Sequence, residues 1–111
     1  MENAEFFKDY RDFVSFQPER YGKATLFENE QALVGLNCLE LGQSMEKHAH
    51  EIQVRFYVLI EGEGSIWIGE ECQQIRPGCV AWIPPGYPHR LKNTGTSNLV
   101  LLVGIVPGKT D

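Results

Sequence analysis

The chain has no cluster of basic residues and no long apolar run. Its 10 Lys and Arg stand against 15 Asp and Glu, and the formal net charge is -5 at pH 7. A surface of this kind repels phosphate backbones, so we expect no nucleic-acid partner. The longest apolar stretch, LVLLVGIV at 99–106, is far shorter than the roughly 20 residues that a membrane-spanning helix needs. We therefore expect no membrane partner either.

Cysteines are few, and their spacing forms no recognisable pair. Cys38, Cys72 and Cys79 are an odd number with no CxxC spacing, which is typical of reduced thiols rather than of a disulfide framework. The acidic N-terminal stretch MENAEFFKDYRDF also lacks the apolar region of a secretory signal. Both observations predict a cytoplasmic protein.

Short segments of strand-forming residues, separated by turn residues, run through most of the chain. With 111 residues, 42% of them hydrophobic, the chain is large enough for one domain with a core and too small for two. GEG at 62–64 predicts a hairpin turn. Many short strands without a convincing long helix indicate an all-β sandwich or barrel. The segments that we expect to form strands are 23–28, 32–41, 53–60, 64–69, 72–75, 80–83, 88–92 and 99–106.

The N-terminal segment, residues 1–20, differs from the predicted barrel domain at 21–111. It mixes charged residues with aromatic ones, among them Phe6, Phe7, Tyr10 and Phe13. Two interpretations are open. The segment could form a short helix whose aromatic side chains pack on the barrel, or an arm that lies over a neighbouring subunit.

The chain has only three histidines, His48, His50 and His89. On an extended strand, His48 and His50 project from the same face, because side chains alternate with a period of two. Two imidazoles on one face can bind one metal ion, with Zn–N bonds of about 2.0–2.1 Å. The HxH pair alone fits two exposed strand histidines equally well, so the surrounding pattern has to decide.

Two motifs contain these histidines. The first spans residues 42–62 and includes His48, His50 and Arg55, and the second is GCVAWIPPGYPHRLKN at 78–93. They resemble the two signature motifs of the cupin superfamily, G-x5-H-x-H-x(3,4)-E-x6-G and G-x5-P-x-G-x2-H-x3-N. The second motif matches at every defined position. The first matches at all but one, where Arg55 stands in place of the glutamate. The sequence is thus similar to that of a small single-domain cupin.

This resemblance implies an all-β double-stranded β-helix, or jelly-roll, barrel. It also implies that His48, His50 and His89 meet inside the barrel and bind a divalent transition metal. Fe, Mn, Ni, Cu and Zn all accept neutral imidazoles, so the identity of the metal stays open. We expect Tyr57, Trp67 and Trp82, together with Leu59 and Leu91, to line the interior and contact a ligand.

Arg55 is the departure from the family pattern. A guanidinium has five donors, no lone pair and a permanent positive charge, so it cannot replace the glutamate as a metal ligand. Three interpretations are open. In the first, the histidines hold the metal and Arg55 binds a carboxylate ligand through paired hydrogen bonds. In the second, Gln53 supplies an amide oxygen to the metal while Arg55 pairs with Glu51 or Glu61. In the third, the metal site is lost and the barrel binds a small organic anion directly.

The expected function is that of a small metal-binding protein that binds or transforms a small anionic ligand, either a carboxylate or a sugar derivative. If it is an enzyme, the resemblance implies a metal-dependent dioxygenase, isomerase or lyase acting on a small acidic substrate. The alternative is a binding or sensing protein without turnover, because no residue beyond the histidines has the setting of a general acid or base. The resemblance also implies a homodimer, since small single-barrel cupins usually associate through sheet faces or exchanged edge strands.

Overall fold

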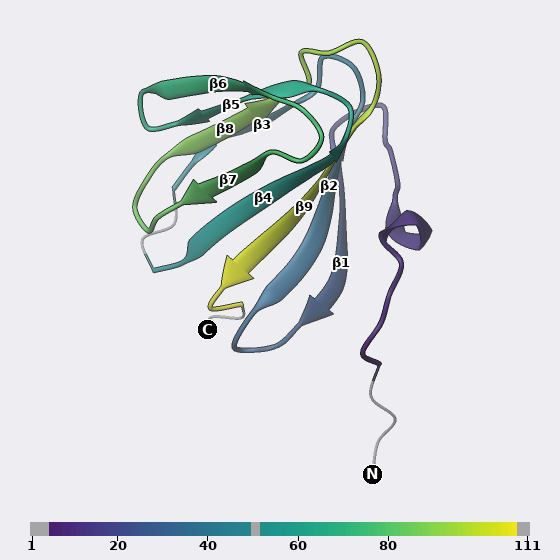
Figure 1. Ribbon diagram of the computed structural model, residues 1–111, viewed down its shortest axis with the longest axis vertical. Coiled ribbons are helices and arrows are strands. Elements are labelled where there is room, and N and C mark those ends of the chain that lie inside the picture. The colour runs from purple at the N-terminus through teal and green to yellow at the C-terminus, as the bar shows by residue number, and fades with distance from the viewer. Residues whose placement is uncertain (1–4, 50–51, 109–111) are drawn as a thin grey trace.

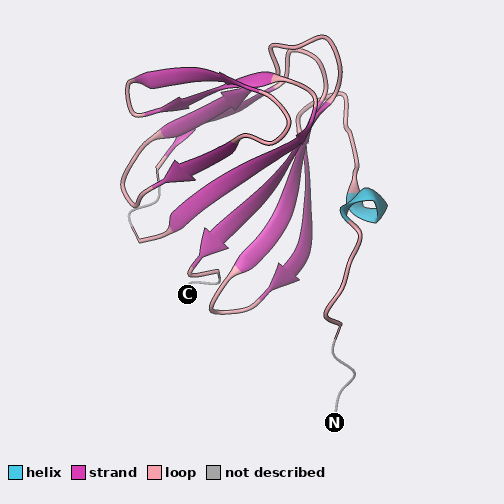
Figure 2. Ribbon diagram, in the orientation of Figure 1, coloured by secondary structure: helices cyan, strands magenta, loops and turns pink. Residues whose placement is uncertain are grey.

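The computed structural model describes residues 5–49 and 52–108, whose strands form two antiparallel sheets that face each other (Figures 1 and 2). The strand order is β1-β2-β9-β4-β7 in the five-stranded sheet and β3-β8-β5-β6 in the four-stranded sheet. This arrangement confirms the predicted all-β jelly-roll fold. In this part of the chain, no helix is long and apolar enough to cross a membrane. The elements are η1 (Tyr10–Phe13), β1 (Gly22–Glu28), β2 (Leu33–Leu39), β3 (Ser44–His48), β4 (Val54–Glu61), β5 (Gly64–Ile68), β6 (Glu71–Ile75), β7 (Val80–Ile83), β8 (His89–Lys92) and β9 (Leu99–Val106).

The main core lies between the two sheets. Alternate residues of each strand face inward, as the period-two geometry of a strand requires. On β9, for example, Leu99, Leu101 and Val103 are buried in this core. The remaining buried members come from both sheets and are Leu39, Met45, Tyr57, Leu59, Ile66, Ile75, Ile83, Leu91 and Ile105.

A second core lies on the outer face of the five-stranded sheet, where the N-terminal segment crosses it. Tyr10 and Phe13 of η1 pack, with Val14 and Phe16, against a buried group of sheet residues. This contact agrees with the first interpretation of the segment. Phe6 and Phe7, which are 77% and 90% exposed, take no part in it. The buried sheet residues are Leu26, Leu36, Cys38 and Val100, and burial raises the pKa of the Cys38 thiol.

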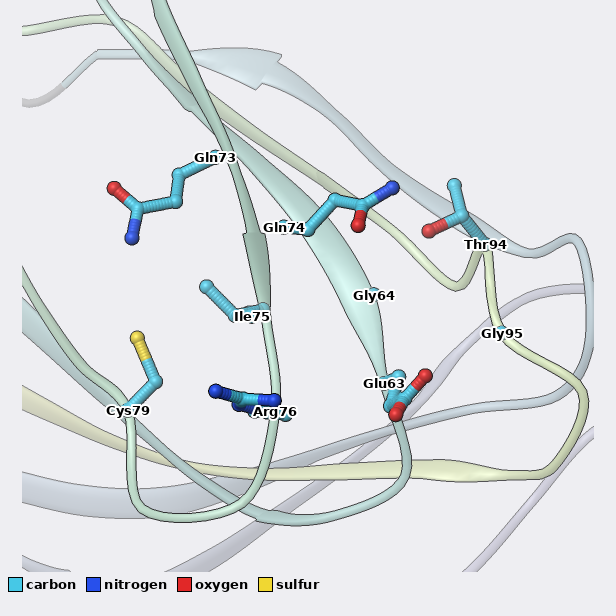
Figure 3. Close-up of a pocket in the computed structure, with 9 residues that line it drawn as sticks. All are labelled: Glu63, Gly64, Gln73, Gln74, Ile75, Arg76, Cys79, Thr94 and Gly95. Atoms are coloured by element: carbon cyan, nitrogen blue, oxygen red, sulfur yellow. The ribbon is translucent and has the colours of Figure 1, made fainter.

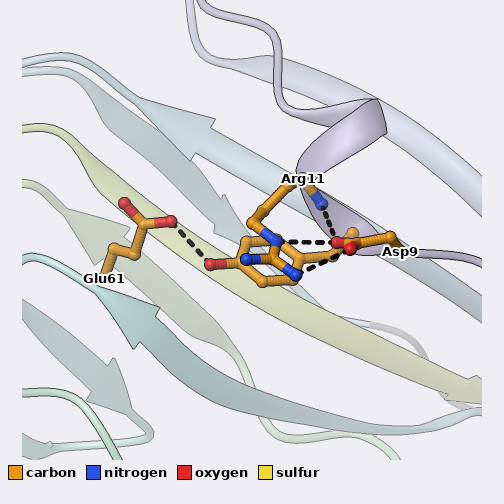
Figure 4. Close-up of polar contacts among 4 residues, drawn as sticks. Asp9, Arg11 and Glu61 are labelled. Atoms are coloured by element: carbon orange, nitrogen blue, oxygen red, sulfur yellow. Dashed lines mark hydrogen bonds and ion pairs between the residues drawn. The ribbon is translucent and has the colours of Figure 1, made fainter.

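Polar contacts hold the N-terminal segment to the sheet (Figure 4). The Tyr10 hydroxyl donates to Oε2 of Glu61 at the end of β4, at 2.7 Å. Asp9 caps η1 by accepting from the backbone NH of Arg11 at 2.9 Å, and its carboxylate also accepts from the Arg11 guanidinium. These hydrogen bonds lower the pKa of Asp9 to about 2, so its carboxylate stays charged.

The observed strands agree closely with the predicted ones. All eight predicted segments coincide with a strand, with ends that differ by two residues at most. The strand that the prediction did not include is β3, because its sequence SMEKH contains no β-branched or aromatic residue. It forms at the edge of the four-stranded sheet by pairing with β8.

The prediction of a hairpin turn at GEG is wrong. The strands on either side of it, β4 and β5, belong to different sheets and do not pair. Residues 62–63 instead carry the chain from one sheet to the other. Gly62 has a φ of +85°, and a Cβ there would collide with the backbone carbonyl of Asn98, so only glycine fits.

Asn93, the last residue of the second motif, closes the turn after β8. Its side-chain amide donates to the carbonyl oxygens of Leu39 (3.0 Å) and Ser97 (2.9 Å), and its Oδ1 accepts from the NH of Gly95 at 3.0 Å. The side chain is only 1% exposed. The bond to Leu39 joins the two sheets at this end of the barrel.

We predict that Asn93→Ala destabilises the fold by about 2–3 kcal/mol, because it leaves buried carbonyl and NH groups without partners. Chemical denaturation followed by tryptophan fluorescence measures the effect. Asn98→Ala is the matched control: Asn98 is exposed in the same loop, and its replacement should change the stability by less than about 0.5 kcal/mol. Equal effects of the two substitutions would contradict the role of Asn93.

Candidate functional site

The inner face of β4 presents Arg55 and Tyr57 to the space between the sheets. Arg55 lies opposite Ile83 of β7 and Ile105 of β9 in the two ladders. Both isoleucines are buried, at 2% and 9% exposure. Tyr57, two residues along, is 1% exposed. The charged and phenolic groups therefore enter an apolar interior from the five-stranded sheet.

His89 meets Tyr57 from the opposite sheet. It begins β8 and is 1% exposed. Its Nε2 lies 3.3 Å from the Tyr57 hydroxyl, which also donates to Sδ of Met45 at 3.6 Å. The centroids of the Tyr57 and His89 rings are 5.9 Å apart and the rings are tilted by 55°. Tyr57 thus makes polar contacts to β8 and β3 across the core.

Met45 is a site residue that the sequence analysis missed. It lies on β3 opposite Leu91 and is 3% exposed. The available signal was that Met45 is the only large apolar residue between the glycine and the histidines of the first motif.

The guanidinium of Arg55 lies in the protein without a fixed counter-charge. Its Nε is buried and has no hydrogen-bond partner among residues 5–49 and 52–108. The ion pair seen within these residues is between Arg11 and Asp9 and does not involve Arg55. Glu61, one of the two predicted partners of Arg55, accepts a hydrogen bond from Tyr10 instead. Glu51, the other predicted partner, lies outside the described residues. The side chain is half-buried and hydrogen-bonds the uncharged phenol of Tyr57. A charge that is partly removed from water without a counter-charge is costly, so this position favours an anion.

The same guanidinium affects Tyr57. Burial raises the pKa of the Tyr57 phenol, and the nearby positive charge of Arg55 opposes the rise without cancelling it. Tyr57 is therefore a neutral hydroxyl at physiological pH. It can donate a hydrogen bond beside the Arg55 cation.

The three histidines are described to different degrees. His48 ends β3, and its backbone lies directly opposite that of His89 in the β3–β8 ladder. His50 lies outside the described residues. No cluster of three His, Cys, Asp or Glu occurs within the described residues. Three imidazoles are a chemically suitable donor set for a divalent transition metal, and the pairing of His48 with His89 fits it, while the positive charge of Arg55 weakens cation binding.

Gln53, the predicted alternative ligand, makes a different contact. Its amide nitrogen donates to the carbonyl oxygens of Pro107 (2.9 Å) and Gly108 (3.3 Å). The side chain therefore ties the start of β4 to the segment after β9. Its role as a metal ligand stays a prediction.

Trp67 and Trp82 point away from the interior, contrary to expectation. Trp67 alternates on β5 with the inward-facing Ile66 and lies under Arg90, whose Cζ is 4.2 Å from the ring centroid. Trp82 precedes the inward-facing Ile83 on β7, is 60% exposed and stacks on Phe56 with ring centroids 6.3 Å apart. Their strand parity places both rings on the outer faces of the sheets.

A cavity of about 370 Å³ lies at the C-terminal end of β6, and none of the predicted site residues lines it (Figure 3). Figure 3 shows Gln73 and Ile75 projecting from one side of β6, toward Cys79, and Gln74 from the other. The remaining lining residues are Glu63, Gly64, Arg76, Thr94 and Gly95. The polar contacts around Tyr57 form a separate site.

Comparisons of this chain with known proteins and structures agree on one family. The cupin domain family matches residues 35–105. The crystal structure of TT1209 from Thermus thermophilus is 35% identical, with a TM-score of 0.87 over 91% of this chain and 96% of that one. The structure of a predicted oxalate decarboxylase from Thermotoga maritima is 28% identical, with a TM-score of 0.73 over 77% and 78% of the two chains.

Two relatives of uncharacterised function also match in sequence. MJ1618 from Methanocaldococcus jannaschii is 29% identical over 62 residues, which are 56% of this chain and 50% of that protein. SCO3923 from Streptomyces coelicolor is 30% identical over 63% of this chain and 66% of its own length. The match therefore spans about half to two thirds of these relatives. Since the family match covers most of the barrel and both sheets have the jelly-roll arrangement, the chain belongs to the cupin family.

Proposed function

We propose that this cupin binds a small organic anion inside its barrel, with Arg55 as the positively charged contact. The observation that carries the proposal is the buried Nε of Arg55, which has no hydrogen-bond partner among the described residues. A carboxylate can accept two parallel hydrogen bonds from a guanidinium and neutralise it. A ligand oxygen beside Arg55 would compete with Met45 Sδ, a weak acceptor, for the single proton of the neutral Tyr57 hydroxyl.

The second part of the proposal is that His48, His50 and His89 hold a divalent transition metal: Fe, Mn, Ni, Cu or Zn. Such a metal supplies a Lewis acid, or a redox centre, beside the ligand. Arg55 puts a positive charge where the family pattern has the negatively charged glutamate. An anionic substrate or effector would then offset the charges of both Arg55 and the metal ion. The relative described as a predicted oxalate decarboxylase supports a carboxylate ligand, because oxalate is a small dicarboxylate. If the protein is an enzyme, the same relative favours a lyase reaction.

We predict that Arg55→Ala lowers the affinity for acetate and oxalate by about tenfold or more, because a charge-assisted hydrogen bond contributes about 1.5–3 kcal/mol. Isothermal titration calorimetry measures the affinity. The control is Arg90→Ala, which removes an arginine that stacks on Trp67 on the outer face and should leave the affinity unchanged. Unchanged carboxylate binding by Arg55→Ala would exclude the clamp.

We predict that Arg55→Glu binds Mn²⁺ or Zn²⁺ at least tenfold more tightly than the unmodified protein, because a carboxylate can coordinate the metal that a guanidinium repels. Metal titration of chelator-treated protein, purified without a metal-affinity tag, measures the affinity. The same substitution combined with His89→Ala should lose the gain. If neither protein binds a metal under any loading condition, the histidine site is a vestige and the anion is bound directly.

We also propose that a second copy of the chain covers the outer face of the five-stranded sheet. Apart from Glu61 at the end of β4, which accepts from Tyr10 of the N-terminal segment, the outward positions of β4, β7 and β9 carry no charge, and Val80, Trp82 and Val106 are 63%, 60% and 45% exposed. The chain's own N-terminal segment covers the adjoining half of this face.

The dimer is tested by placing a charge on this face. We predict that the protein elutes with twice the mass of one chain in light scattering coupled to size exclusion, and that Val80→Arg elutes as a monomer. Gln74→Arg is the control, because Gln74 is exposed on the outer face of the other sheet and its replacement should leave the dimer intact. A monomeric unmodified protein would contradict the proposal.

A further inference from the structure

A cavity of about 380 Å³ opens between the edge strands of the two sheets. Residues of β6, an edge strand of the four-stranded sheet, and of β7, an edge strand of the five-stranded sheet, both line it. They form no ladder with each other within the described residues. The cavity volume is near the lower end of the ~300–1,000 Å³ typical of small-molecule sites.

The floor of this cavity is apolar. Ile66 and Ile75 are core residues, 3% and 4% exposed, and Ile68 and Ala81 pack against the same core. Trp82, Pro84 and Tyr87 form an aromatic and apolar rim. The one charged lining residue is Glu71, which is exposed at the start of β6.

The strand registers connect this cavity to the site around Tyr57. Ala81 lies directly opposite Tyr57 in the β4–β7 ladder, and Ile68 lies directly opposite His89 in the β5–β8 ladder. Residues that face each other across a ladder have Cβ atoms about 4.5–5.5 Å apart. The inner wall of the cavity is therefore in contact range of the Tyr57–His89 pair, whose polar atoms are 3.3 Å apart.

The chemistry of the two ends differs. Beyond the inner wall, next to the residues that line the cavity, β4 carries the Arg55 cation and the Tyr57 hydroxyl, which suit a carboxylate. The floor of the cavity offers isoleucine and alanine, and Gln73 is the one amide side chain in its lining. Most hydroxyl groups of a sugar acid would therefore lose their hydrogen bonds to water there. The outer end has the negative charge of Glu71, which disfavours a second carboxylate there.

From this arrangement we infer that the ligand is a monocarboxylic acid with an apolar body, aromatic or branched aliphatic. Its carboxylate would lie at Arg55 and its body in the cavity over Ile66, Ile68 and Ile75. The inference rests on the proposed function, because it needs the anion contact at Arg55. Beyond the proposed function, it specifies which class of carboxylic acid binds at Arg55.

The test compares phenylacetate, acetate and gluconate as ligands in calorimetric titrations. The expected result is that phenylacetate binds at least tenfold more tightly than acetate, because its ring is removed from water, and that gluconate gains no such advantage. Ala81→Leu adds a side chain to the inner wall and should reduce the ratio of phenylacetate to acetate affinity to below about threefold. Ala81→Val, which adds less volume, serves if the leucine variant does not fold, and should reduce the ratio in the same direction.

The outcomes separate this inference from the proposed function. Gluconate binding as tightly as phenylacetate, or a ratio unchanged by both Ala81 variants, overturns the apolar ligand while leaving the Arg55 contact in place. Phenylacetate binding that resists Arg55→Ala overturns the carboxylate clamp, and with it the orientation inferred here. No binding of any of the three acids overturns both. Gln74→Leu, on the outward face of β6, is the control and should leave the ratio unchanged.

Discussion

The alternation of side chains along β4 is the constraint on which both the core and the site depend. β4 lies between β7 and β9, so its inward positions have neighbours on both sides. Those positions hold Arg55, Tyr57 and Leu59, while the outward Phe56 stacks on Trp82. A shift of one residue in the register would exchange these sets and place Phe56 inside and the guanidinium outside. Long ladders with β7 and β9 prevent that shift.

The consequence of this register is an interior that holds a cation among isoleucines. Arg55 is half-buried, and a guanidinium partly removed from water is stabilised by a counter-charge or by the water that still reaches it. Tyr57 does not neutralise it, because burial keeps the phenol protonated. This charge is the basis of the proposed anion contact at Arg55. An anion that enters the barrel would satisfy both Arg55 and any metal held by the histidines.

The two sheets meet differently on their two sides. Asn93 joins them by bonding to the carbonyl of Leu39, and Tyr57 joins them inside through its contacts with His89 and Met45. Between β6 and β7 no ladder forms in the described chain, and a cavity remains. The same edge strand, β7, presents Val80 and Trp82 to solvent. One strand thus borders both the proposed ligand cavity and the proposed dimer face.

By itself the sequence determined the fold family and the positions of most strands. Two spaced motifs identified the barrel, and runs of strand-forming residues between turn residues located eight strands, because these signals are local. Tertiary structure decided what local signals do not contain. It formed β3 from SMEKH by pairing with β8, and it turned GEG into a link between sheets rather than a hairpin. It also directed Trp67 and Trp82 outward and brought Met45 and Tyr57 to His89. Which face of a strand is buried depends on the register with neighbours distant in sequence, so aromatic character alone could not assign the residues that surround a ligand.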